Sequence, residues 1–311
     1  MSNIKIYNED SYKFLEQLGI QNIFHGVATD PPYGINFKNK KWDKQYPKSD
    51  FWKLCHNVLY PGGYLISFSS TKLLHKMTQE IENADFEIID ILMWSYLNGM
   101  PKNQNIGLLV DKELNVQSNE NGVYKYKQGY SIDSELSYTE EKIKYTPSSK
   151  EGIIYDGFGV RLKPAYEPII LAQKRISEET VAANILKYGT GALNLEETRI
   201  PYDQNEKSVG HNPHELGRVA SNVLRDEYHN DGYDKFFCIQ KVRKSNGHPT
   251  AKPVGIMEHL VKLISVKNQF ILDPFVGSGT TLEACINTER NCVGIEKELE
   301  YFNISHKRIF H

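Results

Sequence analysis

The chain of 311 residues carries 37 lysine and arginine residues against 39 aspartate and glutamate residues, a formal net charge of −2 at pH 7. This near-neutral charge weakens the case for nucleic-acid binding but does not exclude it, because phosphate contact needs only a local basic face. The 40% content of hydrophobic residues allows a real core, and the length suits one large domain with an elaborate insertion. The sequence shows no signal peptide and no apolar run long enough to cross a membrane, so we expect a cytoplasmic protein.

Strand and helix patterns alternate along the chain, which predicts an α/β fold with a mostly parallel central sheet. Apolar runs predict strands over residues 3–10, 23–30, 63–70, 86–96, 166–174, 270–273 and 291–295. Helices are predicted over residues 11–18, 50–59, 71–84 and 253–265, with another opening at 280. Open sheets of this kind bind ligands beyond the carboxyl ends of their strands.

The apolar run at 23–28 leads into Asp30, Pro31, Pro32 and Tyr33. The two prolines lack an N–H, so the turn is stiff and its carbonyls stay free to accept hydrogen bonds. A planar amine held there can donate one N–H to the Asp30 carboxylate and the other to the Pro31 carbonyl, while Tyr33 lies flat against the attached ring. Two acceptors would aim the lone pair of a nucleobase amine at an electrophile. The simpler alternative is a proline turn that caps a strand, with Asp30 solvated.

A second motif, FILDPFVGSGTT at 270–281, predicts a strand, a glycine turn and a helix N-terminus, the layout that cradles a nucleotide-like cofactor. The third glycine of a dinucleotide fingerprint would fall on Leu282, and no Gly-Lys-Ser/Thr of a phosphate-binding loop follows. The next strand ends at Glu296, an acid suited to a ribose diol. Without pyrophosphate features, these residues favour a phosphate-free adenosine cofactor, and S-adenosyl-L-methionine fits.

Together, DPPY and FVGSGTT resemble the motifs of the amino-methyltransferases of DNA. The DPPY strand comes first and the cofactor loop last, an order similar to that of the beta group, which is a circular permutation of the usual methyltransferase order. Further stretches that resemble the family lie at 8–11, 14–15, 59–68, 163–168, 189–194 and 248–253. The likeness covers most of the chain except about 111–159. One departure lies at 218–222, where many relatives carry Trp-Pro-Ala-Asn.

The resemblance implies a Rossmann-like S-adenosylmethionine-dependent methyltransferase fold with an inserted target-recognition region. Residues 1–110 would form the catalytic half. Residues 111–245 would form the insertion and target-recognition region, including a core strand at 166–174, and residues 246–311 the cofactor-binding half. The implied catalytic residues are Asp30, Pro31, Pro32 and Tyr33. The implied cofactor contacts are Asp10, Thr250, Lys252, Asp273, Phe275, Gly277, Gly279, Thr280 and Glu296, with Thr250 and Lys252 near the methionine end.

The activity that the resemblance implies is transfer of a methyl group to the 6-amino group of adenine in double-stranded DNA. Transfer would be a direct displacement on a flipped-out base. Asp rather than Ser at the first motif position favours adenine in this family, and the alternative is the 4-amino group of cytosine. A third alternative is methylation of RNA or of a protein glutamine, but the enzymes for those reactions usually carry the cofactor loop before the P-P-Y motif. A silent DNA-binding subunit is disfavoured, because Asp30 and the glycine loop are intact.

The stretch 235–252 contains five lysine or arginine residues and no acid. We expect Arg243 and Lys244 to contact DNA, against the alternative of a solvated surface. Trp94 and Tyr96 are candidates for lining the target pocket, with core aromatics as the alternative. The sequence is also compatible with a homodimer and with a separately encoded cognate restriction endonuclease.

No metal is expected. The four cysteines, at 55, 238, 285 and 292, form no C-x-x-C pair, which favours a reducing compartment and argues against zinc. His211, His214 and His229 match no familiar ligand spacing.

Overall fold

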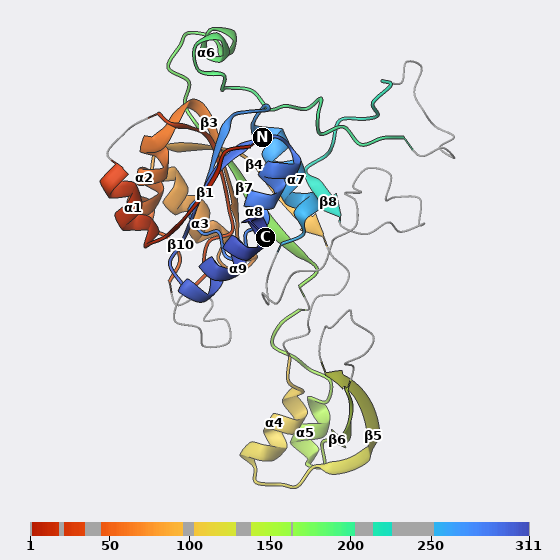
Figure 1. The fold of residues 1–311 in the computed structure, drawn as a ribbon. Coiled ribbons are helices and arrows are strands. Elements are labelled where there is room, and N and C mark those ends of the chain that lie inside the picture. The colour runs from red at the N-terminus through yellow and green to blue at the C-terminus, as the bar shows by residue number, and fades with distance from the viewer. Residues whose placement is uncertain are drawn as a thin grey trace. The chain divides into compact units, whose positions relative to one another are not determined.

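The computed structural model describes residues 2–18, 22–34, 45–95, 103–128, 138–162, 164–202, 214–225 and 252–310. The chain forms two compact units (Figure 1). The larger unit consists of Met1–Tyr96 and Tyr166–His311, and the smaller unit of Leu97–Ala165. Both sequence motifs fall in the larger unit. Among the residues that the structure describes, no helix has the length and apolar character that a membrane span requires.

A central sheet organises the larger unit. Its described strands are β1 (Ile4–Asn8), β2 (Phe24–Thr29), β3 (Leu59–Phe68), β4 (Phe86–Ser95), β7 (Tyr166–Lys174), β8 (Val223–Arg225), β9 (Phe270–Asp273) and β10 (Asn291–Glu296). They lie in the order β1-β10-β9-β2-β3-β7-β4-β8. Strand β7 runs antiparallel to both of its neighbours, and the other described pairs are parallel. The predicted α/β fold with a mostly parallel sheet is therefore confirmed, and the reversed direction of β7 is an addition to it.

Helices cover both faces of this sheet. They are α1 (Ser11–Leu18), α2 (Ser49–Val58), α3 (Leu74–Glu82), α7 (Val254–Ile264), α8 (Thr280–Asn287) and α9 (Leu299–Phe310). A further helix, α6 (Val181–Tyr188), stands away from both faces. Apolar residues of α1, α2 and α3 pack in one core, and those of α7 and α8 in a second core. Figure 1 shows the first group on one side of the strands and α7 and α8 on the other.

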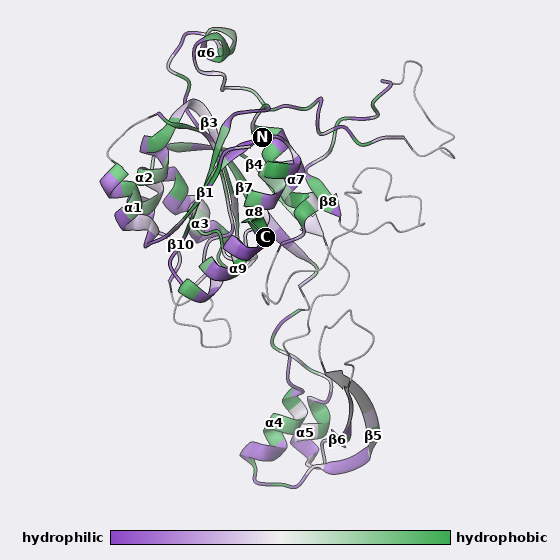
Figure 2. Cartoon of the chain, in the orientation of Figure 1, coloured by the Kyte–Doolittle hydropathy of each residue, from purple (hydrophilic) through white to green (hydrophobic). Residues whose placement is uncertain are grey.

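Side-chain alternation on the central strands explains these two cores. On β3, Ile66 and Phe68 belong to the core under α7 and α8, whereas Leu65 belongs to the core under α1 to α3. Strands buried on both faces read as continuous apolar runs, and Figure 2 colours the middle strands as hydrophobic while the helices carry both colours. β3 starts at Leu59, earlier than the predicted residue 63, because Leu59 already pairs with Phe24 of β2, across an irregularity in register before Tyr64.

The smaller unit contains a hairpin and two short helices. These are β5 (Asn119–Gln128), antiparallel to β6 (Tyr138–Thr146), and α4 (Ile106–Glu113) beside α5 (Lys150–Ile154). The helices approach closely, since a Cβ on Gly107 would lie 2.4 Å from the carbonyl oxygen of Gly152. No periodicity predicted these elements. The compact unit also begins at Leu97, before the predicted start of the insertion at 111, and ends at Ala165, well before residue 245.

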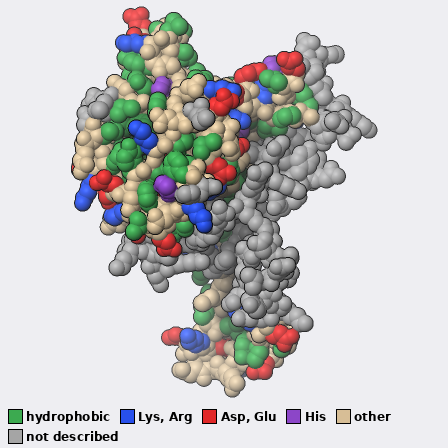
Figure 3. Space-filling view, viewed as in Figure 1, with side chains coloured by type: hydrophobic (Ala, Val, Ile, Leu, Met, Phe, Trp, Pro, Cys, Tyr) green, Lys and Arg blue, Asp and Glu red, His purple; other side chains and the backbone are tan. Residues whose placement is uncertain are grey.

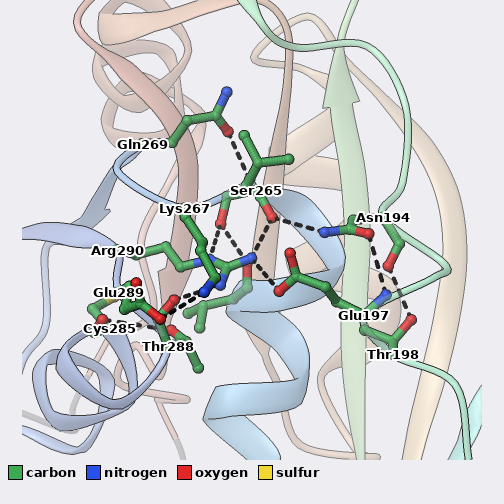
Figure 4. A network of polar contacts seen from close by, with 12 residues as sticks. Asn194, Glu197, Thr198, Ser265, Lys267, Gln269, Cys285, Thr288, Glu289 and Arg290 are labelled. Carbon is green, nitrogen blue, oxygen red and sulfur yellow. Dashed lines mark hydrogen bonds and ion pairs between the residues drawn. The ribbon is translucent and has the colours of Figure 1, made fainter.

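A buried arginine ties the segment after α6 to the residues that end α7 and α8 (Figure 4). Arg290 is fully buried, and its guanidinium donates to the carbonyl oxygens of Ser265 at 2.9 Å and Thr288 at 2.5 Å. It also pairs with Glu197 at 2.8 Å. The backbone N–H of Asn194 donates to the Leu263 carbonyl at 2.8 Å, so this segment is attached to the end of α7 as well. Together these contacts fix the position of α7.

We predict that Arg290→Met lowers the free energy of unfolding by about 2–4 kcal/mol, because buried carbonyl groups lose their donor. Chemical denaturation monitored by circular dichroism measures this. Lys267→Met is the matched control, since it removes an exposed pair with Glu289 in the same region. Its cost should stay below about 1 kcal/mol. Equal effects of the two substitutions would contradict the prediction.

Candidate active site

The two motifs end neighbouring strands of the sheet. β2 pairs in parallel with β9, so Asp30, directly after β2, and Asp273, the last residue of β9, share one edge of the sheet. The Thr29 hydroxyl donates to Oδ1 of Asp273 at 2.7 Å and links the two strand ends. Glu296 ends β10, the other neighbour of β9. Because β7 is antiparallel to β3, the start of β7 and Glu167 reach the same edge. The sheet thus gathers the predicted residues at the place where α/β folds bind ligands.

Four side chains form a charged cluster directly after β2, which we call the Asp30 cluster. Lys252, just before α7, places its Nζ 2.8 Å from Oδ2 of Asp30 and 3.0 Å from Oε2 of Glu167. The Tyr33 hydroxyl donates to Oδ1 of Asp30 at 2.5 Å and lies 3.3 Å from Oε2 of Glu167. Only 7% of the Lys252 side chain is exposed, against 29% for Asp30 and 25% for Glu167. Two partly exposed carboxylates therefore share one buried ammonium.

The alternation of the strands explains why these groups meet. Ala28 and Ile169 face the core under α7, so Asp30 and Glu167, two positions away on the same strands, point to that face too. Lys252 enters this face over the ring of Phe68, 5.0 Å from its centroid. A cation above an aromatic face gains additional stabilisation.

The electrostatics of the cluster fix its protonation at neutral pH. Burial lowers the pKa of Lys252, but the charges of Asp30 and Glu167 raise it more, and the net pKa lies above the ordinary range. Burial raises the pKa of Tyr33, and the two carboxylates raise it further. Lys252 is therefore charged and Tyr33 keeps its proton. Both oxygens of Asp30 carry a donor in this arrangement.

The glycine turn after β9 is built around Glu296. Gly277 and Gly279 adopt left-handed backbone angles, φ 54° and 84°, which favour glycine. Oε2 of Glu296 accepts the N–H of Gly277 and Oε1 accepts the N–H of Glu298, both at 2.8 Å. Burial raises the pKa of Glu296 above its ordinary value, although these two hydrogen bonds act to lower it. A carboxylate has about four acceptor directions, so about two remain for the hydroxyls of a ribose.

Asp10 lies beside this turn, because β1 pairs with β10 in a register that places Asn8 opposite Glu296. Oδ2 of Asp10 pairs with Lys297 at 2.8 Å. Burial raises the pKa of Asp10, but the hydrogen bond and charge of Lys297 help to bring the net pKa below its ordinary value. Phe275 packs against Phe51 with ring centroids 5.0 Å apart. The predicted residues Asp10, Phe275, Gly277, Gly279 and Glu296 are thus brought together.

Two other predicted cofactor residues contact protein groups. Asp273 is 2% exposed, and its Oδ1 accepts from Thr29 and from the N–H of Phe275 at 3.0 Å. The hydroxyl of Thr280, which opens α8, accepts from Arg308 at 3.0 Å. These contacts hold the turn in shape. Their direct contact with a cofactor stays a prediction.

Several predicted residues lie outside the described part of the chain, namely Tyr96, His211, His229, Arg243, Lys244 and Thr250. Pro31 is buried and Pro32 half-buried. Trp94 packs in the core, 6.4 Å from Phe68 between ring centroids. His214 pairs with Glu196 at 3.3 Å. Within the described ranges, no group of three or more His, Cys, Asp or Glu could hold a metal ion. Glu167 was not predicted as a site residue, although its stretch was part of the family likeness.

A family model described as DNA methylase matches residues 24–307, which include both motifs. The chain belongs to this family of DNA amino-methyltransferases. The type II methyltransferase M.HpaI of Haemophilus parainfluenzae is 37% identical over 93% of this chain and 69% of the relative. The DNA adenine methyltransferase YhdJ of Escherichia coli (strain K12) is 29% identical over 50% of this chain and 49% of the relative. The solved complex of M1.HpyAVI with SAM shares the fold, with a TM-score of 0.51, 22% identity, and coverage of 98% of this chain and 99% of that one.

The protein is therefore a DNA methyltransferase that uses S-adenosyl-L-methionine to methylate an exocyclic amine of adenine or cytosine. The residues fit this cofactor, because Glu296 keeps acceptor directions for a diol and the neighbouring turn carries no phosphate-binding lysine.

Asp273 gives a pH-dependent prediction. Burial raises its pKa to about 6, against hydrogen bonds from Thr281 and Thr29. The folded state then binds a proton more tightly than the unfolded state, so this group's contribution to stability falls as the pH rises from about 4 to about 6. Asp273→Asn keeps the acceptor oxygen without the charge. We expect it to raise the unfolding free energy near neutral pH by roughly 1–3 kcal/mol, and the gain to vanish near pH 4. Denaturation at several pH values measures this, and a variant less stable at every pH would refute it.

Proposed function

We propose that this protein methylates the 6-amino group of adenine at specific sites in double-stranded DNA. The observation that carries the proposal is the position of Asp30, a partly exposed carboxylate directly after β2, the strand that pairs with β9 and so lies beside the glycine turn. The family tendency for Asp at this position favours adenine, and YhdJ is described as an adenine methyltransferase. The motif order supports a place in the beta group. Cytosine N4 is the alternative, because a carboxylate can accept from either amine.

In the proposed mechanism, Asp30 accepts one N–H of the target amine and the Pro31 carbonyl accepts the other. The hydrogen bond from Tyr33 to Asp30 fixes the carboxylate, and the same ring offers a face to the base. When bound, S-adenosylmethionine supplies a methyl group on a sulfonium, a very good leaving group. The residues of the chain act by positioning and electrostatics, and no covalent enzyme intermediate is required. Since a stacked base cannot reach such a site, the target flips out of the duplex.

We further propose that Asp10, Phe275, Gly277, Gly279 and Glu296 surround the cofactor. Lys252 was predicted near its methionine end, whereas its contacts with Asp30 and Glu167 favour a position at the amine side of the proposed site.

We propose that basic groups other than Lys252 bind the DNA, and that Arg243 and Lys244 are among them. On the face of the larger unit that Figure 3 shows, acidic and basic side chains are interspersed. The target-recognition role of 111–245, a homodimer and a cognate endonuclease also stay proposals.

Substitutions of Asp30 test the chemistry and the target base. Asp30→Ala should abolish methyl transfer while the fold and cofactor binding persist, because Glu167 remains as a counter-charge for the buried Lys252. Asp30→Asn keeps an acceptor oxygen without the charge, so we expect a severe but incomplete loss. Nucleoside mass spectrometry after incubation with cofactor and mixed-sequence duplex DNA should find 6-methyladenine. Methyl on the cytosine amine would overturn the base assignment, and full activity of Asp30→Ala would overturn the mechanism.

Substitution of Glu296 tests the cofactor site. Glu296→Ala should weaken S-adenosylmethionine binding by about 1.5–3 kcal/mol, because a charge-assisted hydrogen bond to the ribose is lost. Calorimetry measures the affinity. Glu298→Ala is the matched control: Glu298 is exposed, and the alanine keeps the backbone N–H that Glu296 accepts. Equal affinity of the Glu296 variant and the wild-type protein would remove Glu296 from the cofactor site.

A further inference from the structure

Glu167 has no part in the mechanism above, yet it lies within the Asp30 cluster. Its Oε2 contacts both the Lys252 ammonium, at 3.0 Å, and the Tyr33 hydroxyl, at 3.3 Å. The same two groups hold Asp30, at 2.8 Å and 2.5 Å. Glu167 therefore contacts the same two groups, Lys252 and Tyr33, that hold Asp30, the proposed acceptor of the target amine.

The ammonium of Lys252 stands where an amine donor belongs. Oδ1 of Asp30 is engaged by Tyr33, and Oδ2 by Lys252. Each oxygen keeps a further acceptor direction. An amine that donates to Oδ2 therefore competes there with the Lys252 ammonium. A buried ammonium that loses its counter-charge is strongly destabilised. Lys252, 7% exposed, can yield only if another carboxylate keeps it paired.

We propose that Glu167 is a positioning residue for methyl transfer, which retains the Lys252 ammonium when the target amine takes the Oδ2 side of Asp30. This inference rests on the proposed role of Asp30. The backbone of Glu167 is fixed, because β7 lies inside the sheet and pairs with β4 at Trp94 and with β3 further along. Its carboxylate is thus a fixed acceptor for the cation. Tyr33, between the two carboxylates, keeps Asp30 oriented during the exchange.

The first test is Glu167→Gln, which keeps the shape but weakens the hold on Lys252, so that the ammonium stays on Asp30. We expect kcat to fall roughly 10- to 100-fold, with an unchanged KM for S-adenosylmethionine. The assay uses labelled cofactor and mixed-sequence duplex DNA. Glu197→Gln is the matched control, because Glu197 also pairs with a buried cation, Arg290, at 2.8 Å (Figure 4). Its kcat should stay within about twofold of wild type. A wild-type kcat for the Glu167 variant, or an equal loss in the control, would contradict the proposal.

The second test asks whether the effect passes through Lys252. If the defect of Glu167→Gln arises because Lys252 stays on Asp30, the double variant Glu167→Gln with Lys252→Met should be faster than Glu167→Gln, at saturating cofactor. A merely structural role predicts the opposite, since two buried contacts are then lost. A double variant as slow as Glu167→Gln, or slower, would refute the proposal.

Lys252→Met alone tests the arrangement with Glu167 intact. The groups that face Asp30 are Lys252 from the segment before α7, Glu167 from β7, Asp273 from β9 and Tyr33 from its own turn. Without the ammonium, negative charges crowd together, and binding of a proton at the site becomes more favourable. Activity should then fall at lower pH and recover as the pH rises. A loss independent of pH would contradict the shared-cation arrangement.

Asp30→Ala distinguishes a failure of the proposed function from a failure of the proposed role of Glu167. If that variant stays active, the proposed function of Asp30 fails and the role of Glu167 fails with it. If it is inactive while Glu167→Gln has the wild-type kcat, only the role of Glu167 is wrong.

Discussion

The parallel pairing of β2 with β9 is the constraint on which the site depends. The two strands come from opposite ends of the chain, and the hydrogen bond from Thr29 to Asp273 joins their carboxyl ends. This contact brings the turn that we propose for the amine beside the turn that we propose for the cofactor. The proposed direct methyl transfer would depend on such positioning. The central place of these strands also buries them on both faces, so the distance between the turns is fixed by the sheet itself.

The site combines rigid backbone with an unusual concentration of charge. Lys252 is nearly buried, and its only described counter-charges within ion-pair distance are Asp30 and Glu167. A buried ion pair contributes little net stability but is costly to break on one side. The cluster therefore resists any state in which Lys252 is alone. Two carboxylates on one ammonium are also what the proposed exchange at Asp30 requires.

The sequence predicted the elements that end in strong local signals. The strands that lead to Asp30, Asp273 and Glu296 are apolar runs followed by proline, glycine or an acid, and each was found where expected. The contact between Glu167 and Lys252 could not be predicted, because it depends on the antiparallel direction of β7. Nothing in the residues of a strand states its direction. The hairpin of the smaller unit was missed for a related reason, since a polar two-stranded ribbon shows little hydrophobic periodicity.

The connectivity of the sheet explains how a large insertion fits into the chain without disturbing the site. The smaller unit leaves the sheet after β4 and returns at β7, and the register places Ser95 opposite Tyr166. The paired residues bring the two attachment points together, and each doubling of the length of the inserted segment adds only about 0.6 kcal/mol to the cost of closing the loop. The returning strand carries Glu167 one residue after Tyr166. The covalent link to the inserted unit is thus one residue away from the carboxylate that shares Lys252 with Asp30, and the pairing of Glu167 with Trp94 of β4 holds its backbone in the sheet.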